Sequence, residues 1–244
     1  ISRRSFIGGA TIFGATVAAA SLTGCGGSGS AASTGEAAST TGGTLNITLA
    51  SSPKYLDPCK YTGVYESQVI NNVCDTLVQY KMDLSEIVPC LATDWTISDD
   101  GMTYTFNLRS DAKFQAGQYQ DGRALTADDV KYALERSATE SAMNRLSMLD
   151  HVNVVSDTQV ECVLKQPAAS FLTDAGNVIV PKEEVEGWGD AFGDHLVGTG
   201  PFSLKSFTKD QVSELVRHDN YWGDKPTLDG VNFKVITDTS QAVN

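Results

Sequence analysis

The 244-residue sequence predicts a mixed α/β fold, and three observations indicate it. Residues 103–109 (TYTFNLR) alternate apolar and polar side chains, as a strand with one buried face does. Residues 64–80 carry apolar side chains at helical spacing, from Val69 to Tyr80. The stretch from Thr126 to Asp129 has the spacing of a helix N-cap with an acidic third residue, and an apolar stripe follows it.

The other elements follow in chain order. Residues 44–50 (TLNITLA) alternate like a half-buried strand and run into the loop SSPKYLDP, in which two prolines and Asp57 enforce an irregular backbone. A short helical segment is expected at residues 168–174. Further strands are expected at 151–156, 158–164, 202–207, 211–217 and 231–237.

Glycine-containing pairs mark the expected turns between these elements. Asp100-Gly101 and Asp229-Gly230 are typical of turns in which glycine adopts a positive φ. The segment from Gly198 to Pro201 lets the chain turn sharply into the strand at Phe202.

The first 24 residues have the layout of a bacterial export signal. Arg3 and Arg4 stand directly before an uncharged run, residues 6–22, which is too short and too weakly apolar for a transmembrane helix. The paired arginines resemble a Tat signal, and Leu22-Thr23-Gly24-Cys25 resembles the lipoprotein processing box. We therefore expect residues 1–24 to be a Tat-type lipoprotein signal peptide. Cys25 is then the lipidated residue that anchors the protein to the outer face of the cytoplasmic membrane.

Residues 25–43 have the composition of a tether, because they are almost entirely Gly, Ser, Ala and Thr and cannot bury a core. The formal net charge of −12 makes nucleic acid an unsuitable partner. The globular part is expected to span residues 44–244.

The sequence offers little support for catalysis or metal binding. Beyond Cys25, the cysteines at positions 59, 74, 90 and 162 lack zinc-ligand spacing; they either form disulfides or stay as buried thiols, and the sequence leaves both open. The three histidines are scattered, and no nucleophile elbow occurs. We predict no catalytic residues, no metal site and no cofactor.

An ordered set of motifs is the most specific signal in the chain. It comprises Leu56-Asp57-Pro58, Pro89-Cys90-Leu91-Ala92 with Trp95, Asp100-Gly101, Tyr104 to Arg109, Lys113-Phe114, Asp121-Gly122, Leu125 to Val130, Val197 to Phe202, and Asn220 to Gly223 with Leu228 to Val231. This set resembles the extracellular solute-binding proteins of family 5, which serve peptide- and nickel-type ABC importers. The resemblance covers nearly all of residues 44–244.

The resemblance implies a periplasmic-binding-protein-like fold of type II, peptide-binding subclass. Residues 44–244 would form its first lobe, a mixed sheet with flanking helices. Family members run considerably further, so the fold is expected to be incomplete: the second lobe would be absent from this N-terminal fragment.

The implied function is capture of peptides or similar small solutes in a cleft between two lobes, and delivery to an ABC permease and ATPase complex, by a monomer. Nickel chelates, haem and sugars remain open as ligands. The alternative is an exported enzyme or an adhesion or receptor lipoprotein on the same scaffold.

By the same resemblance, the loop Ser52-Pro53-Lys54-Tyr55 lies at the cleft, where Lys54 or Tyr55 would meet a carboxylate or an apolar side chain of the ligand. A loop that is merely solvated is the alternative. Asn177 is the second candidate contact.

Overall fold

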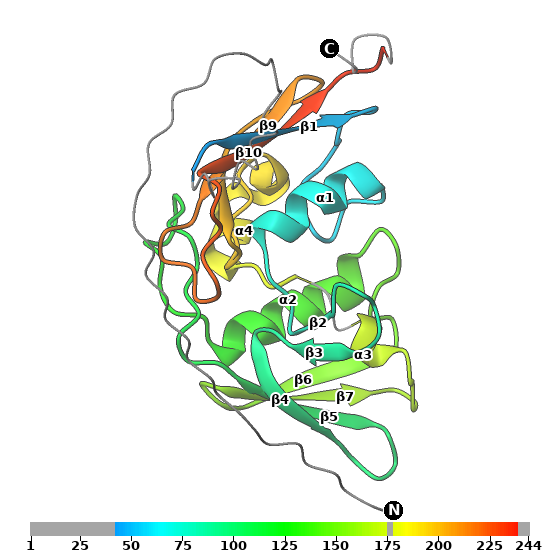
Figure 1. The fold of residues 1–244 in the computed structure, drawn as a ribbon. Coiled ribbons are helices and arrows are strands. Elements are labelled where there is room, and N and C mark those ends of the chain that lie inside the picture. Colours follow the sequence, from blue (N-terminus) through cyan, green and yellow to red (C-terminus); the bar gives the residue numbers. More distant parts are fainter. Residues whose placement is uncertain (1–41, 175–177, 239–244) are drawn as a thin grey trace, which may run out of the picture. The chain divides into compact units, whose positions relative to one another are not determined.

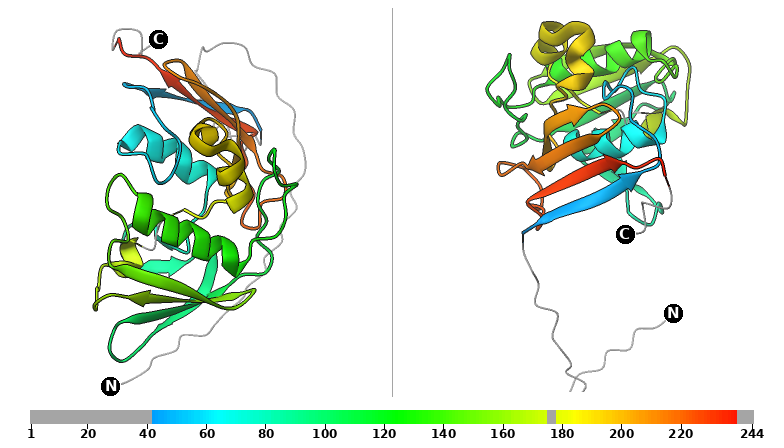
Figure 2. Two further views of the ribbon diagram at one scale, coloured as in Figure 1. Left: turned by 180° about the vertical axis from the view of Figure 1, so that it is seen from behind. Right: turned by 90° about the horizontal axis from the view of Figure 1, so that it is seen from above.

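Two four-stranded sheets organise the chain in this computed structural model, which describes residues 42–174 and 178–238 (Figure 1). The first sheet has the order β1-β10-β9-β8, formed by Thr44–Leu49, Gly230–Val235, Val212–Arg217 and Phe202–Thr208. β1 pairs with β10 in parallel, and the other pairs are antiparallel. The view from above in Figure 2 shows β1 (blue) beside β10 (red), so the ends of the described chain meet in one sheet.

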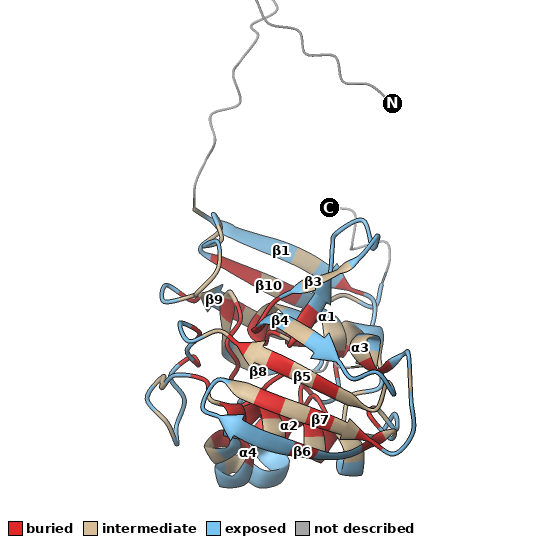
Figure 3. Ribbon diagram, turned by 90° about the horizontal axis from the view of Figure 1, so that it is seen from below, coloured by how far each residue is buried: buried red, intermediate tan, exposed pale blue. Residues whose placement is uncertain are grey.

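The second sheet is wholly antiparallel and has the order β4-β5-β7-β6. Its strands are Ala92–Ile97, Thr103–Leu108, Gln159–Leu164 and Leu149–Ser156. β5 and β7 alternate buried and half-buried residues, whereas much of β4 and β6 at the edges is exposed (Figure 3). The predicted buried face of residues 103–109 is confirmed, because Tyr104, Phe106 and Leu108 are all buried.

Two longer helices cover the sheets. α1 (Val64–Val73) contacts the first sheet at β8, and α2 (Ala127–Glu140) packs on β6 and β7 (Figure 1). α2 begins as predicted, since the Asp129 carboxylate accepts a hydrogen bond from Thr126 N at 3.0 Å and completes a capping box.

Shorter elements complete the described chain. They are the hairpin of β2 (Val78–Tyr80) and β3 (Ile87–Pro89), the helices α3 (Phe171–Asp174) and α4 (Lys182–Trp188), and the 3₁₀ helix η1 (Gly189–Asp194). The helical segment expected at residues 168–174 is thus confined to one turn.

The helix predicted for residues 64–80 was wrong beyond Val73. The Val73 carbonyl accepts hydrogen bonds from Gly200 N and from the buried Gln115 amide, both at 2.9 Å, in place of Leu77 N. Cys74 is extended, and the chain continues into β2. A tertiary contact therefore ends a helix that the apolar spacing alone would have continued.

Glycines 198 and 200 press against this helix end. A Cβ on Gly198 would lie 2.5 Å from both Val73 O and Cys74 Sγ, and one on Gly200 would lie 2.7 Å from Val73 O. Close packing on α1 thus requires glycine at both positions of the predicted turn before Phe202.

One predicted glycine conformation is confirmed and another is wrong. Gly101 has a φ of 69°, as expected of its turn. Gly230 instead begins β10 without a positive φ, and its missing Cβ lets Leu215 O approach to 2.5 Å of the Cβ position.

β1 is less buried than its alternating pattern predicts. Leu49 is buried and Ile47 half-buried, but Leu45 is 46% exposed, because β1 lies at the edge of its sheet. Cys59, Cys74, Cys90 and Cys162 are buried thiols without disulfides.

No helix within residues 42–174 and 178–238 is long and apolar enough to cross a membrane. Arg3, Arg4, Cys25 and Asn177 lie outside the described residues.

Candidate functional site

The candidate site begins with the loop between β1 and α1, residues 50–63. Since β1 and β10 are parallel, their carboxyl ends meet at one edge of the sheet, where Ile236 N donates to Leu49 O at 2.9 Å. In open α/β sheets, ligands bind outside the carboxyl ends of strands. The loop that follows β1 at this edge is therefore the first candidate for a ligand contact.

A buried ion pair holds the middle of this loop. The Asp57 carboxylate accepts hydrogen bonds from Nη1 and Nη2 of Arg136 on α2 at 2.9 and 2.7 Å, and both side chains are buried. Burial alone lowers the pKa of Arg136, but its hydrogen bonds to Asp57 and the nearby negative charges raise that pKa overall, so the guanidinium stays charged. Asp57 also accepts from Cys59 N and closes the turn that follows. The Leu56-Asp57-Pro58 motif thus ties the loop to α2.

The first half of the loop contains the four predicted contact residues. Ser52 Oγ accepts from Asp210 N at 2.9 Å, which joins the loop to the β8–β9 turn, and Pro53 is buried. Lys54 N donates to the buried Glu66 carboxylate at 2.8 Å, while its side chain is exposed. Tyr55 is 54% exposed, with Lys209 Nζ 5.8 Å from its ring centroid. Of these four residues, only Lys54 and Tyr55 are therefore exposed.

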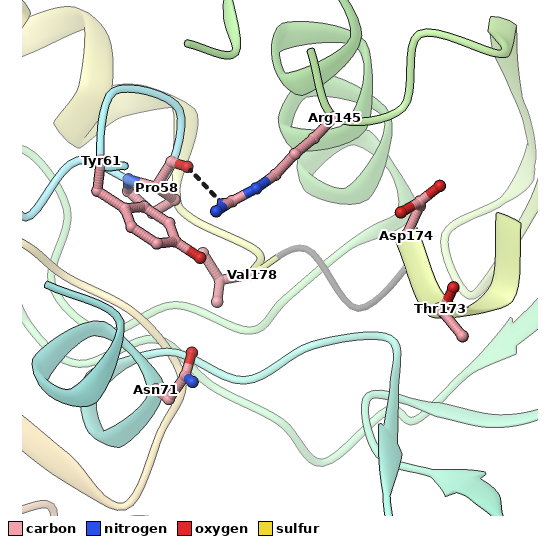
Figure 4. A pocket seen from close by; sticks show the side chains of 7 residues that line it. All are labelled: Pro58, Tyr61, Asn71, Arg145, Thr173, Asp174 and Val178. Carbon is pink, nitrogen blue, oxygen red and sulfur yellow. Dashed lines mark hydrogen bonds between the residues drawn. The ribbon is translucent and has the colours of Figure 1, made fainter. Parts of the chain in front are cut away.

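A cavity of about 230 Å³ opens beside the second half of the loop (Figure 4). Its walls come from the loop itself, α1, the α2–β6 connection, and α3 with the residue that follows the undescribed segment. The lining residues are Pro58, Tyr61, Asn71, Arg145, Thr173, Asp174 and Val178.

Arg145 is the cation of this cavity. Its guanidinium carbon lies 4.0 Å from the Tyr61 ring centroid, and Nη1 donates to Pro58 O at 3.4 Å. Ala142 N also donates to Cys59 O at 2.8 Å, which docks the α2–β6 connection onto the loop. The cavity thus combines one arginine with amide, hydroxyl and carboxylate groups, a set suited to a small polar solute.

Within the described residues, we find no group of side chains arranged as a metal site and no thiol activated as a nucleophile. No group of three or more His, Cys, Asp or Glu side chains within it is placed to hold a metal ion. Burial raises the pKa of Cys59 and Cys90 to about 11 and that of Cys162 to about 12. These thiols therefore stay protonated at neutral pH, and a protonated thiol is a poor nucleophile.

The sequence predicted contacts at residues 52–55 and at Asn177, but it did not single out Tyr61 or Arg145. The predicted contact Asn177 falls between the lining residues Asp174 and Val178, although it is itself not described. Tyr61 and Arg145 were missed because they lie 84 positions apart, and only the docking of the α2–β6 connection brings them together.

Comparison with known proteins identifies the family of this chain. The family model for bacterial extracellular solute-binding proteins, family 5 (middle region), matches residues 86–244. The dipeptide-binding protein of Escherichia coli is 30% identical over 230 residues, which cover 84% of this chain and 43% of the relative. The nickel-binding periplasmic protein of E. coli is 32% identical over 185 residues, which cover 70% and 33%.

Solved structures show the same similarity. The periplasmic binding protein DppA of Helicobacter pylori, in complex with the peptide STSA, matches with a TM-score of 0.76 and 29% identity over 83% of this chain and 44% of that one. The chain spans less than half the length of these relatives.

The two sheets with their flanking helices define a partial periplasmic-binding-protein fold of type II, the class of the peptide-binding proteins. The chain belongs to the family 5 bacterial extracellular solute-binding proteins.

Proposed function

We propose that the protein containing this chain is the substrate-binding component of an ABC importer, which captures peptides or similar small solutes outside the cytoplasm. The observation that carries this proposal is the polar cavity beside the β1–α1 loop, in a chain of the solute-binding family. Residues 44–244 supply one wall of the ligand cleft, and the remaining length typical of the relatives supplies the other. The protein acts as a monomer and hands its ligand to a permease and ATPase complex.

The ligand-facing groups proposed here are Lys54, Tyr55, the cavity side chains and Asn177, with Ser52 and Pro53 fixing the loop; Asn177 lies outside the described residues. A loop that exposes Lys54 and Tyr55 and also contributes Pro58 and Tyr61 to a polar cavity suits a solute with both apolar and charged parts. The relatives bind peptides or nickel by name, and none of those reported above is an enzyme or an adhesion protein. The comparisons thus give no support to the enzyme or adhesion alternative, and we propose a binding role without catalysis.

We further propose that residues 1–24 are a Tat-type signal peptide, that Cys25 carries the lipid anchor and that residues 25–43 form the tether. Cys25→Ser is expected to move the protein from the membrane fraction to the soluble extracytoplasmic fraction, measured by fractionation and intact-mass analysis. Replacement of Arg3 and Arg4 by lysine is expected to leave unprocessed precursor inside the cell. Membrane association that survives Cys25→Ser would contradict the anchor.

The solute class is tested on the complete gene product without its lipid. Thermal unfolding is measured with di- to pentapeptides, oligosaccharides, nickel chelates and haem. A ligand at ~100 times its Kd adds about 2.7 kcal/mol to stability, so peptides are expected to raise the unfolding midpoint. A shift with nickel chelates or haem alone would overturn the peptide assignment, and no shift with any class would contradict solute capture.

A further inference from the structure

Arg145 differs from every other arginine in the described chain, because it forms no ion pair with an Asp or Glu there. The others are paired: Arg109 with Asp111, Arg123 with Asp129 and Glu183, Arg136 with Asp57 and Glu140, and Arg217 with Asp219 and Asp229. In a chain of net charge −12, Arg145 is thus an arginine that lines a cavity without being paired to a carboxylate among the described residues.

The guanidinium is held in place without using up its donors. It stacks on Tyr61, and its hydrogen bonds go to Pro58 O at 3.4 Å and to the Met143 sulfur at 3.3 Å. A guanidinium has five N–H donors, so donors remain for a carboxylate, which it binds best in a two-bond fork. Both acceptors are neutral, and neither offsets its positive charge.

The backbone around Arg145 is also constrained. Asn144 and Leu146 have φ angles of 57° and 55°, a left-handed conformation that is unfavourable for leucine. The Leu146 side chain is fully buried, which holds this backbone in place. Arg145 is therefore presented from a fixed turn, so little side-chain and loop freedom remains to be lost on binding.

Figure 4 shows the direction of the side chain. The guanidinium extends toward Pro58 and Tyr61 and away from Asp174, which lies on the α3 wall.

We infer that Arg145, stacked on Tyr61, binds a carboxylate group of the captured solute and so selects for ligands that carry one. This inference rests on the proposed function, since it assigns one end of the ligand to this cavity.

The test uses the complete gene product and pairs of probes that differ only in the carboxylate. Dialanine, trialanine and tetraalanine are each compared with their C-terminal amides, and benzoate is compared with benzamide, by isothermal titration calorimetry. A hydrogen bond to a charged group contributes ~1.5–3 kcal/mol, so amidation is expected to weaken binding to the wild type at least ~10-fold. In Arg145→Gln the acid is expected to bind as weakly as the amide.

Arg217→Gln is the matched control, because Arg217 is paired with Asp219 and Asp229 and does not line the cavity. It is expected to keep the wild-type ratio of acid to amide affinity. Unfolding midpoints of both variants separate loss of a ligand contact from loss of the fold. If Arg145→Gln does not fold, Arg145→Lys takes its place. Lysine keeps the positive charge but cannot form the two-bond contact with a carboxylate, so the ratio of acid to amide affinity is expected to fall only partly.

The outcomes separate this inference from the proposed function. Peptide acids and amides that bind equally, or a ratio unchanged in Arg145→Gln, would overturn the role of Arg145 and leave peptide capture standing. Binding of benzoate through Arg145 without any peptide would support the carboxylate site and overturn the peptide assignment. Binding of no probe would overturn both.

Discussion

At the residue scale, the Asp57–Arg136 pair is the contact on which the β1–α1 loop depends. Its two hydrogen bonds join residues 79 positions apart, with side-chain exposures of only 3% and 7%. Such a pair is sensitive because removal of one partner leaves a buried charge without compensation.

Arg136→Met is expected to lower the free energy of unfolding by about 3–5 kcal/mol. Glu186→Gln is the control, since it breaks the exposed Lys182–Glu186 pair, which contributes less than ~1 kcal/mol. Urea unfolding of the complete protein measures both. Equal losses in the two variants would show that the loop does not depend on the buried pair.

The buried thiols predict a specific loss of stability in alkali. Burial raises the pKa of Cys162 to about 12 in the folded protein, from an ordinary value of 9.0. Above pH 9 the unfolded chain releases this proton while the folded chain keeps it, so the free energy of unfolding falls as pH rises.

Between pH 8.5 and 10.5 the wild type is expected to lose about 2 kcal/mol more than Cys162→Val, which has no thiol to titrate. The comparison cancels the lysines and tyrosines that titrate in both proteins. Urea unfolding at the two pH values measures the loss in each protein. Equal losses in the wild type and in Cys162→Val would contradict this role of burial.

At the element scale, local patterns predicted the start of α2 and every strand of the two four-stranded sheets except β4, which was missed. They did so because each of these elements is decided by its own alternation or cap. The end of α1 could not be predicted, since Gly200 and Gln115, which bind the Val73 carbonyl, lie far along the chain. The cavity at Arg145 escaped prediction for the same reason.

The contact between Gly200 and α1 can be tested directly. Gly200→Ala is expected to cost about 2–3 kcal/mol, because the added Cβ meets Val73 backbone atoms that cannot move aside. Gly187→Ala is the control: its Cβ meets the ring of Tyr119, which is 47% exposed and can rotate away. Unfolding midpoints measure both, and a tolerated Gly200→Ala would show that this junction can relax.

At the scale of the whole molecule, the motifs that carried the family resemblance serve mainly to join the elements. Thr199 and Trp222 come from two of these motifs, and both donate hydrogen bonds to the buried Asp75 carboxylate, at 3.0 and 2.7 Å. Arg109 from a third motif stacks on the Trp222 ring at 3.5 Å. This explains why an ordered set of short motifs could identify the fold, whereas these motifs say little about which side chains would face a ligand.

The parallel pairing of β1 with β10 has a consequence for the order of folding. These strands join residues 186 positions apart, whereas the second sheet is built entirely within residues 92–164. Contacts between distant residues form late, because closing a long loop costs entropy before the contact is made. Pulse-labelled hydrogen exchange during refolding of the complete protein is expected to protect β5 and β7 before β1, and simultaneous protection would contradict this order. During synthesis, β1 leaves the ribosome early and must wait for β10, so the β1–α1 loop acquires its shape only when almost all of this chain has been made.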